Sequence, residues 1–210
     1  MEKWSLKYLK LRITLWPKIT IKIILKKINK MTLVSTEWLN SNLSKVKIFD
    51  ASWHMPNSNR NAHKEYLKKH IPGAMFWDLD EHSDKDSPFP HMLPNSDYWT
   101  RMLWSFGITN DDHIVVYDFS AVHSSCRLWF SLKYFGHQKV SVLDGGMKKW
   151  LKENRPISNE INKDIGKFSY IDKINTKNKY KVSENFDWIK KKEQIDKNIK
   201  TNLFTLVDAR

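Results

Sequence analysis

Residues 70–94 hold the densest group of side chains in this sequence that could bind a ligand or move protons. The stretch reads HIPGAMFWDLDEHSDKDSPFPHMLP. Past its opening Ile-Pro-Gly turn it carries acidic groups and histidines, namely Asp78, Asp80, Glu81, His82, Asp84, Asp86 and His91. A connection this long and polar, interrupted by several prolines, is typical of a functional or binding loop. A solvated acidic loop without a function is the competing interpretation.

The sequence offers little for a metal site or a disulfide. Cys126 is its single cysteine, so an internal disulfide and a cysteine-based zinc site are both excluded. Cys126 stands near the start of an expected helix, where the helix dipole could lower its pKa. Free cysteines are commonly small core residues, and a buried, inert thiol is therefore our prediction. We expect no metal and no cofactor, and surface or capping roles for histidines without metal-site spacing: His63, His70, His82, His113, His123 and His137.

Charge is distributed unevenly along the 210 residues. The net charge is +13, of which +8 falls in residues 1–30 and +5 in residues 155–200, while residues 31–154 carry equal numbers of basic and acidic side chains. A neutral body of this kind argues against a nucleic-acid partner. No stretch approaches the ~18 uninterrupted apolar residues of a membrane span. With one cysteine, a reducing, cytoplasmic setting fits best.

The elements that must position the acidic loop alternate between short apolar strands and helices. Strands are expected at 46–49, 74–77, 114–117 and 140–143, and the run Ile114 to Tyr117 is apolar enough to be buried on both faces. Helices are expected from Ser35 or Thr36, then over 61–70, over 95–106 with Ser96 as a possible N-cap, over 124–135, and from Gly145-Gly146 to Lys152. This alternation predicts an α/β fold with a central, mostly parallel sheet flanked by helices.

Composition divides the chain into four segments. Residues 1–31 form a basic N-terminal extension, 32–155 the α/β domain, 156–181 a linker rich in Lys, Asn and Ile, and 182–210 the start of a truncated second copy. The second copy is inferred because VSENFDW echoes VSTEW, and LFTLVDAR echoes the strand that ends in Asp50. For residues 1–30 a membrane-surface helix, a targeting peptide and translation that begins at Met31 stay open. We favour a disordered or loosely helical extension.

Several motifs together resemble the two-domain rhodanese-like sulfurtransferases, closest to the 3-mercaptopyruvate and thiosulfate sulfurtransferases. The most specific is DxDxxSDxxSPxxHMLP, which begins at Asp78; the others are VSTEWL, FDASWHMP, HIPGA, GITNDDHIVVYD, DGGMKKW and the terminal LVDAR. The resemblance covers about residues 32–155 and returns weakly up to Arg210. It implies a rhodanese-like domain of the non-catalytic, N-terminal type, followed by an incomplete second copy.

The resemblance also assigns roles to individual residues. Asp80 and His91 match positions that form an acid–histidine relay with a serine of the second domain, because a carboxylate can orient an imidazole that moves a proton. Asp118 stands in the slot of the sulfur-carrying cysteine and cannot accept sulfur. Cys126 is out of register with that slot, so no nucleophile is expected in this chain. Arg127 matches a first-domain arginine that we expect to form a structural ion pair.

The sequence therefore predicts a sulfurtransferase-family protein, with thiosulfate or 3-mercaptopyruvate as sulfur donor and a thiol or cyanide as acceptor. Because the cysteine loop is missing, we expect the chain to be inactive alone, although its complete form would bind a small sulfur-containing anion. One alternative is a non-catalytic binding or assembly module, or half of a split enzyme that pairs with a separately encoded second half. Another is a degraded gene product, for which an exposed Trp-rich face would predict self-association.

Overall fold

The computed structural model describes residues 32–161 and 180–207. All the elements in these ranges belong to one compact unit, Leu33–Arg210. The expected basic extension of residues 1–31 lies outside the described residues, as do most of the expected linker and Arg210. Among the described helices, none has both the length and the apolar character that crossing a bilayer requires.

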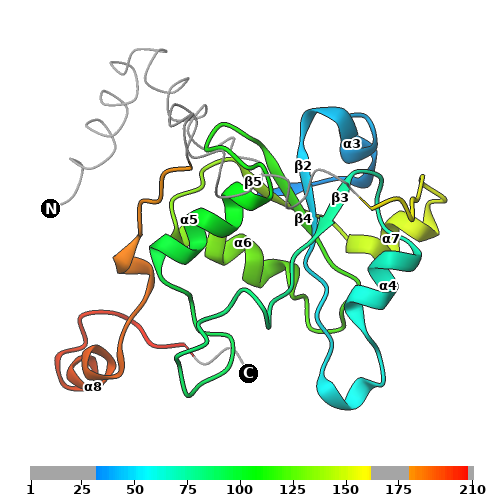
Figure 1. Ribbon diagram of the computed structural model, residues 1–210. Coiled ribbons are helices and arrows are strands. Elements are labelled where there is room, and N and C mark those ends of the chain that lie inside the picture. The colour runs from blue at the N-terminus through cyan, green and yellow to red at the C-terminus, as the bar shows by residue number, and fades with distance from the viewer. Residues whose placement is uncertain (1–31, 162–179, 208–210) are drawn as a thin grey trace, which may run out of the picture. The chain divides into compact units, whose positions relative to one another are not determined.

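A five-stranded parallel sheet forms the centre of the unit (Figure 1). Its strands are β1 (Leu33–Val34), β2 (Lys47–Asp50), β3 (Ala74–Phe76), β4 (Ile114–Tyr117) and β5 (Val140–Leu143), in the spatial order β1-β5-β4-β2-β3. Every neighbouring pair is parallel. The carboxyl ends of β2, β4 and β5 therefore meet at one edge of the sheet, where the loops that follow them can build a site. The predicted α/β fold is confirmed.

Helices cover both faces of the sheet. They are α3 (Thr36–Asn40), α4 (Ala62–Lys68), α5 (Ser96–Ser105), α6 (Ser125–Tyr134) and α7 (Gly146–Lys152), with a further helix α8 (Lys192–Thr201) near the end of the chain. Short 3-10 helices occur at η1 (Leu43–Lys45), η2 (Pro56–Ser58) and η5 (Phe186–Trp188).

The sheet separates two hydrophobic cores, because successive side chains of a strand point to opposite faces. In β2, Phe49 packs in the core that contains the buried residues of α5 and α6, while Ile48 packs with those of α3, α4 and α7. All four residues of β4 are buried, as expected for the central strand of a sheet that is covered on both faces. The tryptophans at positions 77, 99 and 150 are buried in these cores.

Polar side chains fix the starts of three helices. Ser35 accepts a hydrogen bond from the backbone N–H of Trp38 at the start of α3, and Asn61 caps α4 in the same way. At α5 the cap is Asn95, which accepts from the N–H of Tyr98, so the expected Ser96 is instead the first helical residue. Because Asn95 directly follows the acidic loop of residues 70–94, this cap fixes the point where the loop joins α5.

Residues 180–189 pack against the domain that precedes them. Tyr180 is buried, and Glu184 accepts hydrogen bonds from Tyr134 Oη (2.6 Å) and from Ser96 Oγ. Trp188 lies near Trp129 of α6, with 6.4 Å between ring centroids. Residues 203–207 form no strand in the structure. The proposed boundary of a second copy at residue 182 stays a prediction.

Candidate functional site at the carboxyl edge of the sheet

Asp80 and His91 form a direct side-chain pair. His91 Nε2 lies 2.8 Å from Asp80 Oδ1, and the two residues come from opposite ends of the loop between β3 and α5. The His91 side chain is 29% exposed and that of Asp80 is 66% exposed, so the pair is open to a reactant. When ionised Asp80 accepts the proton of Nε2, the lone pair of a neutral His91 is on Nδ1. This pair can orient an imidazole for proton transfer.

Trp53, in the loop after β2, contacts both members of this pair. Its indole Nε1–H donates to the second oxygen of Asp80, Oδ2, at 3.0 Å. Its ring also meets the His91 imidazole edge to face, with 5.0 Å between centroids. Both carboxylate oxygens of Asp80 thus have a defined hydrogen-bond donor, which fixes the orientation of an otherwise exposed group.

Arg127 of α6 holds the backbone of His91. Its guanidinium donates a hydrogen bond to the His91 carbonyl oxygen and lies near the Phe130 ring. Burial lowers the pKa of Arg127 from its usual value, because the charged form loses hydration. Within the described residues Arg127 has no ion-pair partner, so the expected structural ion pair is corrected to a hydrogen bond to a carbonyl. His91 itself has a positive φ of 59°, a backbone conformation that needs such support.

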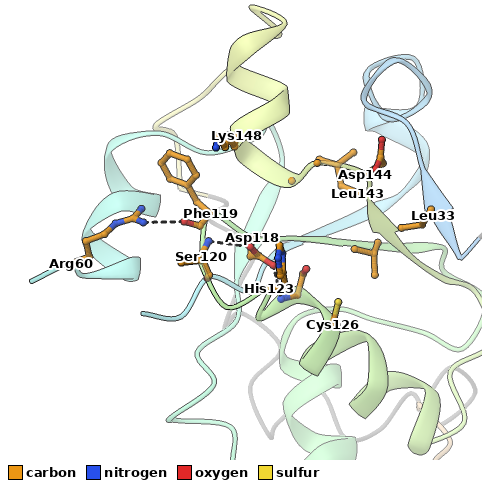
Figure 2. A pocket seen from close by; sticks show the side chains of 15 residues that line it. Leu33, Arg60, Asp118, Phe119, Ser120, His123, Cys126, Leu143, Asp144 and Lys148 are labelled. Atoms are coloured by element: carbon orange, nitrogen blue, oxygen red, sulfur yellow. Dashed lines mark hydrogen bonds between the residues drawn. The ribbon is translucent and has the colours of Figure 1, made fainter. Parts of the chain in front are cut away.

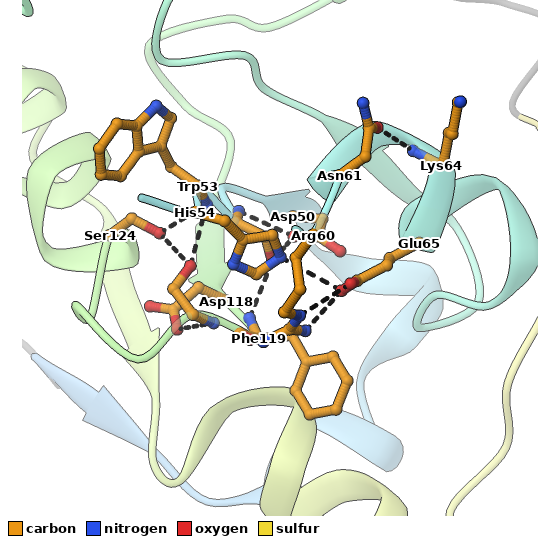
Figure 3. Close-up of polar contacts among 12 residues, drawn as sticks. Asp50, Trp53, His54, Arg60, Asn61, Lys64, Glu65, Asp118, Phe119 and Ser124 are labelled. Atoms are coloured by element: carbon orange, nitrogen blue, oxygen red, sulfur yellow. Dashed lines mark hydrogen bonds and ion pairs between the residues drawn. The ribbon is translucent and has the colours of Figure 1, made fainter. Parts of the chain in front are cut away.

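The loops after β2 and β4 are joined by hydroxyl groups (Figure 3). Ser52 Oγ donates to Asp50 Oδ1 (2.5 Å) and accepts from the N–H of Phe119 (2.8 Å). Ser124 Oγ donates to the carbonyl of Ala51 at 2.7 Å. Burial raises the pKa of Asp50 to about 6, although hydrogen bonds from Ser52 and Tyr117 act in the opposite direction.

Asp118 directly follows β4, in the loop that leads into α6. Its Oδ1 accepts from the N–H of Ser120 (3.0 Å) and its Oδ2 from the N–H of Ser125 (2.8 Å), at the start of α6. These are donors of the kind that bind anions at helix starts. The carboxylate of Asp118 is therefore an internal anion that occupies them.

A hollow of about 440 Å³ adjoins this loop, lined by residues that include Asp118, Ser120, Cys126, Gly146 and Lys148 (Figure 2). Cys126 reaches it from the first turn of α6. The predicted burial of this thiol is wrong, since Cys126 is exposed. The error arose because burial was inferred from residue type, whereas this face of α6 borders the hollow and not the core.

The other polar groups of the acidic loop do not join the Asp80–His91 pair. Asp78 Oδ1 accepts from the backbone N–H groups of Asp80 (2.9 Å) and Glu81 (3.2 Å) and so shapes the turn. His82 turns inward, where its Nδ1 lies 2.9 Å from Tyr98 Oη, and burial lowers its pKa. The loop therefore contains one acid–imidazole pair, surrounded by residues that shape the loop.

Comparison with known proteins identifies the domain that carries these residues. The family model described as the rhodanese-like domain matches residues 35–153, more than half of the chain. The chain belongs to the rhodanese-like family. The matched range contains every site residue named above, from Asp50 to Lys148.

Individual rhodanese-like relatives extend the likeness beyond the domain. Bovine thiosulfate sulfurtransferase is 38% identical over 186 residues, which cover 85% of this chain and 59% of the relative. Mouse 3-mercaptopyruvate sulfurtransferase is 37% identical over 187 residues, with the same coverage. The structure of SseA from Escherichia coli, described as a 3-mercaptopyruvate sulfotransferase, aligns with a TM-score of 0.73 and 28% identity over 86% of this chain and 66% of that one. The chain spans about three fifths of the length of these curated relatives.

Sequence reasoning missed three residues of this rhodanese-like site, namely Trp53, Ser120 and Ser124. A signal was available, because Trp53 follows the strand that ends at Asp50, and Ser120 and Ser124 follow the strand that ends at Tyr117. Loops that follow adjacent parallel strands meet at one edge of the sheet. The contact of Trp53 with Asp80 could not be predicted, because it joins residues 27 positions apart on two loops that are separated by α4 and β3.

Two histidines expected at the surface or in caps are buried. His70 Nδ1 lies 2.7 Å from the Tyr66 carbonyl, and His137 Nε2 lies 3.0 Å from the Asp112 carbonyl. Each imidazole forms a hydrogen bond with a backbone carbonyl group in the interior. The spacing of apolar residues around these histidines did not indicate that they are buried. Over the described ranges no group of three or more His, Cys, Asp or Glu side chains is arranged to hold a metal ion.

Proposed function

We propose that this rhodanese-like domain supplies the Asp80–His91 pair to a sulfurtransferase reaction. The donor would be thiosulfate or 3-mercaptopyruvate, and the acceptor a thiol or cyanide. The observation that carries the proposal is the 2.8 Å contact between His91 Nε2 and Asp80 Oδ1, in a pair that stays open to solvent. His91 Nδ1 would then take a proton from a hydroxyl or thiol presented to it, while Asp80 stabilises the imidazolium.

The nucleophile of this reaction would come from a second domain and not from these 210 residues. Asp118 stands where sulfur would have to be accepted, and its carboxylate already takes the N–H groups of Ser120 and Ser125. Cys126 is exposed at the hollow, but a sulfur carrier needs a set of N–H donors around the sulfur to hold persulfide charge. We therefore propose that the chain alone has no turnover.

Two assays test this function. The purified 210-residue protein is expected to release no sulfide from 3-mercaptopyruvate and form no thiocyanate from thiosulfate and cyanide. A chimera that continues the chain with the unmatched part of bovine thiosulfate sulfurtransferase is expected to turn over, and His91→Ala is expected to lower its kcat by about 100-fold. Turnover by the 210-residue protein that disappears in Cys126→Ser would contradict the proposal.

A non-catalytic binding or assembly role is the second candidate. It is favoured because the Asp118 carboxylate already accepts the backbone N–H groups of Ser120 and Ser125, which leaves them unavailable to a substrate anion. In this case the domain would pair with a separately encoded second half and stabilise it. Titration calorimetry with the isolated second domain of a relative measures such pairing. Tight binding without any gain in turnover would support this candidate over the first.

A reducing, cytoplasmic location is also part of the proposal. Its support is the single cysteine, which cannot form an internal disulfide. Fractionation of cells that express the protein with a C-terminal tag tests it. Recovery with a membrane or organelle fraction would contradict this location.

A further inference from the structure

Asp80 is held more firmly than its exposure would suggest. The side chain is 66% exposed, and an exposed carboxylate on a loop ordinarily samples several rotamers. Here Oδ1 faces His91 Nε2 at 2.8 Å and Oδ2 accepts the Trp53 indole N–H at 3.0 Å. Two donors from different loops fix both the position and the rotation of one carboxylate.

Trp53 is in turn fixed through its backbone by the loop between β4 and α6. The Trp53 N–H is shared between Ser120 Oγ (2.9 Å) and Ser124 Oγ (3.0 Å), and these two hydroxyls lie 2.6 Å apart. Ser124 is buried and also donates to the carbonyl of Ala51, two residues before Trp53. The backbone around Trp53 thus has three hydroxyl contacts from one loop.

The same loop runs into the helix that holds the second member of the pair. Arg127, three residues after Ser124, donates to the His91 carbonyl from the first turn of α6. The segment 120–127 therefore reaches Asp80 through the indole of Trp53 and reaches His91 directly. In this domain Asp118, two residues before this segment, stands in place of a sulfur-accepting cysteine, but the hydrogen bonds of the segment still converge on the acid–imidazole pair.

We propose that Trp53 is a positioning residue for the Asp80–His91 pair, and that the β4–α6 loop sets the geometry of the pair through Trp53. The catalytic meaning of this inference rests on the proposed function, whereas the structural contact does not. The indole N–H is the group that distinguishes positioning from simple packing. Trp53→Phe keeps a ring against His91 and removes the donor to Asp80.

Solvent exchange of the Trp53 indole proton tests the contact in the 210-residue protein without any assay of activity. In ¹H–¹⁵N spectra the Trp53 indole signal is assigned by its loss in Trp53→Phe. A hydrogen bond to a carboxylate protects this proton, so Asp80→Asn is expected to speed its exchange by about tenfold and to shift its signal. An unchanged signal and exchange rate in Asp80→Asn, with the fold retained, would overturn the proposal.

The role of the loop has its own pair of variants. Ser124→Ala removes one of the two acceptors of the Trp53 N–H and the donor to Ala51, and it is expected to speed indole exchange severalfold. Ser105→Ala is the matched control, because Ser105 Oγ also donates to a backbone carbonyl, that of Met102, but at the end of α5. Equal effects of the two variants would show that the loop does not act through Trp53.

The active chimera then separates a positioning role from a binding role. Trp53→Phe is expected to lower kcat by about tenfold while KM changes less than twofold, because the indole acts on the pair and not on the substrate. Trp104→Phe, at a half-buried tryptophan of α5, is the control and is expected to leave both constants unchanged. A chimera without turnover would contradict the proposed function only, since the exchange experiment still decides whether Trp53 positions Asp80. A rise in KM alone would overturn the positioning role.

Discussion

Asp50 shows how burial changes the chemistry of one residue. It is 4% exposed at the end of β2, and burial raises the pKa of its carboxyl to about 6 despite the Ser52 and Tyr117 hydrogen bonds. The charges and dissociable groups around it are Asp118 and Tyr117 from β4 and the loop after it, and Tyr66 from α4. Ionisation of Asp50 is thus disfavoured in the folded state relative to the unfolded chain.

This shift predicts a stability profile with a defined sign. Because the folded pKa lies above the unfolded one, the folded state binds the proton more tightly, and this stabilisation is lost as pH rises toward and past 6. Asn cannot ionise, so the free energy of unfolding of Asp50→Asn should rise relative to the natural protein by about 2–3 kcal/mol between pH 4 and pH 7. Urea unfolding of both proteins at the two pH values measures the change. A constant difference between them would contradict this account of Asp50.

At the scale of elements, the contact between the loop after β4 and the start of α7 depends on one glycine. Gly146 has a φ of +54°, and a Cβ added there would lie 2.6 Å from the carbonyl oxygen of Asp118. That carbonyl also accepts the N–H of Met147 at 2.9 Å, so the two segments are in close backbone contact. A side chain at position 146 would have to push the Asp118 loop away.

Gly146→Ala is therefore expected to lower the free energy of unfolding by about 2–3 kcal/mol, the sum of backbone strain and the steric clash. Gly73→Ala is the matched control, because Gly73 has a φ of +78° but no atom within 4 Å of an added Cβ. Gly73→Ala is therefore expected to lower the free energy of unfolding only through backbone strain, by about 1 kcal/mol. Equal losses in urea unfolding would mean that the close approach to Asp118 contributes nothing.

At the scale of the whole molecule, the chain past residue 180 contributes to the stability of the domain that precedes it. Glu184 accepts hydrogen bonds from Ser96 at the start of α5 and from Tyr134 at the end of α6, so one carboxylate joins two helices to the following segment. Burial and this carboxylate together raise the pKa of Tyr134 to about 12. The family match ends at residue 153, but the packing continues to Trp188.

Loss of this contact is expected to destabilise the entire domain and not only the tail. Glu184→Gln weakens both charge-assisted hydrogen bonds, and we expect the free energy of unfolding to fall by about 1–2 kcal/mol. Glu193→Gln, at an exposed position in the first turn of α8, should change it by less than about 0.5 kcal/mol. Thermal unfolding followed by circular dichroism compares the two variants. Similar melting temperatures would indicate that residues 180–189 are not part of the cooperative unit.

The exposed Trp-rich face expected for a degraded product is absent from the described residues. Of the tryptophans in ranges 32–161 and 180–207, Trp188 alone is exposed, and the others are buried or half-buried. The domain keeps its tryptophans buried or half-buried within itself and against residues 180–189. Exposed tryptophans in the described residues therefore give no reason to expect self-association.

The sequence by itself determined the fold class, four of the five strands and the contact between Asp80 and His91, whereas the short strand β1 was not expected. Apolar runs such as Ile114 to Tyr117 specify buried strands, because only residues covered on both faces can be apolar throughout. The motif from Asp78 to Pro94 predicted that Asp80 and His91 act as a pair, and the two side chains are in contact in the structure. This contact was predictable because both residues lie on one loop, and their short sequence separation limits how far apart they can be.

The tertiary structure alone decided what surrounds that pair. Trp53 reaches it from the loop after β2 and Arg127 from α6, while Ser124 supports the backbone of Trp53. Contacts across such sequence distances depend on how the sheet orders its strands. The exposure of Cys126 and the burial of His70 were likewise set by which face of an element meets the core. Residue type gives an average tendency to be buried, whereas the packing of neighbouring elements fixes the actual environment.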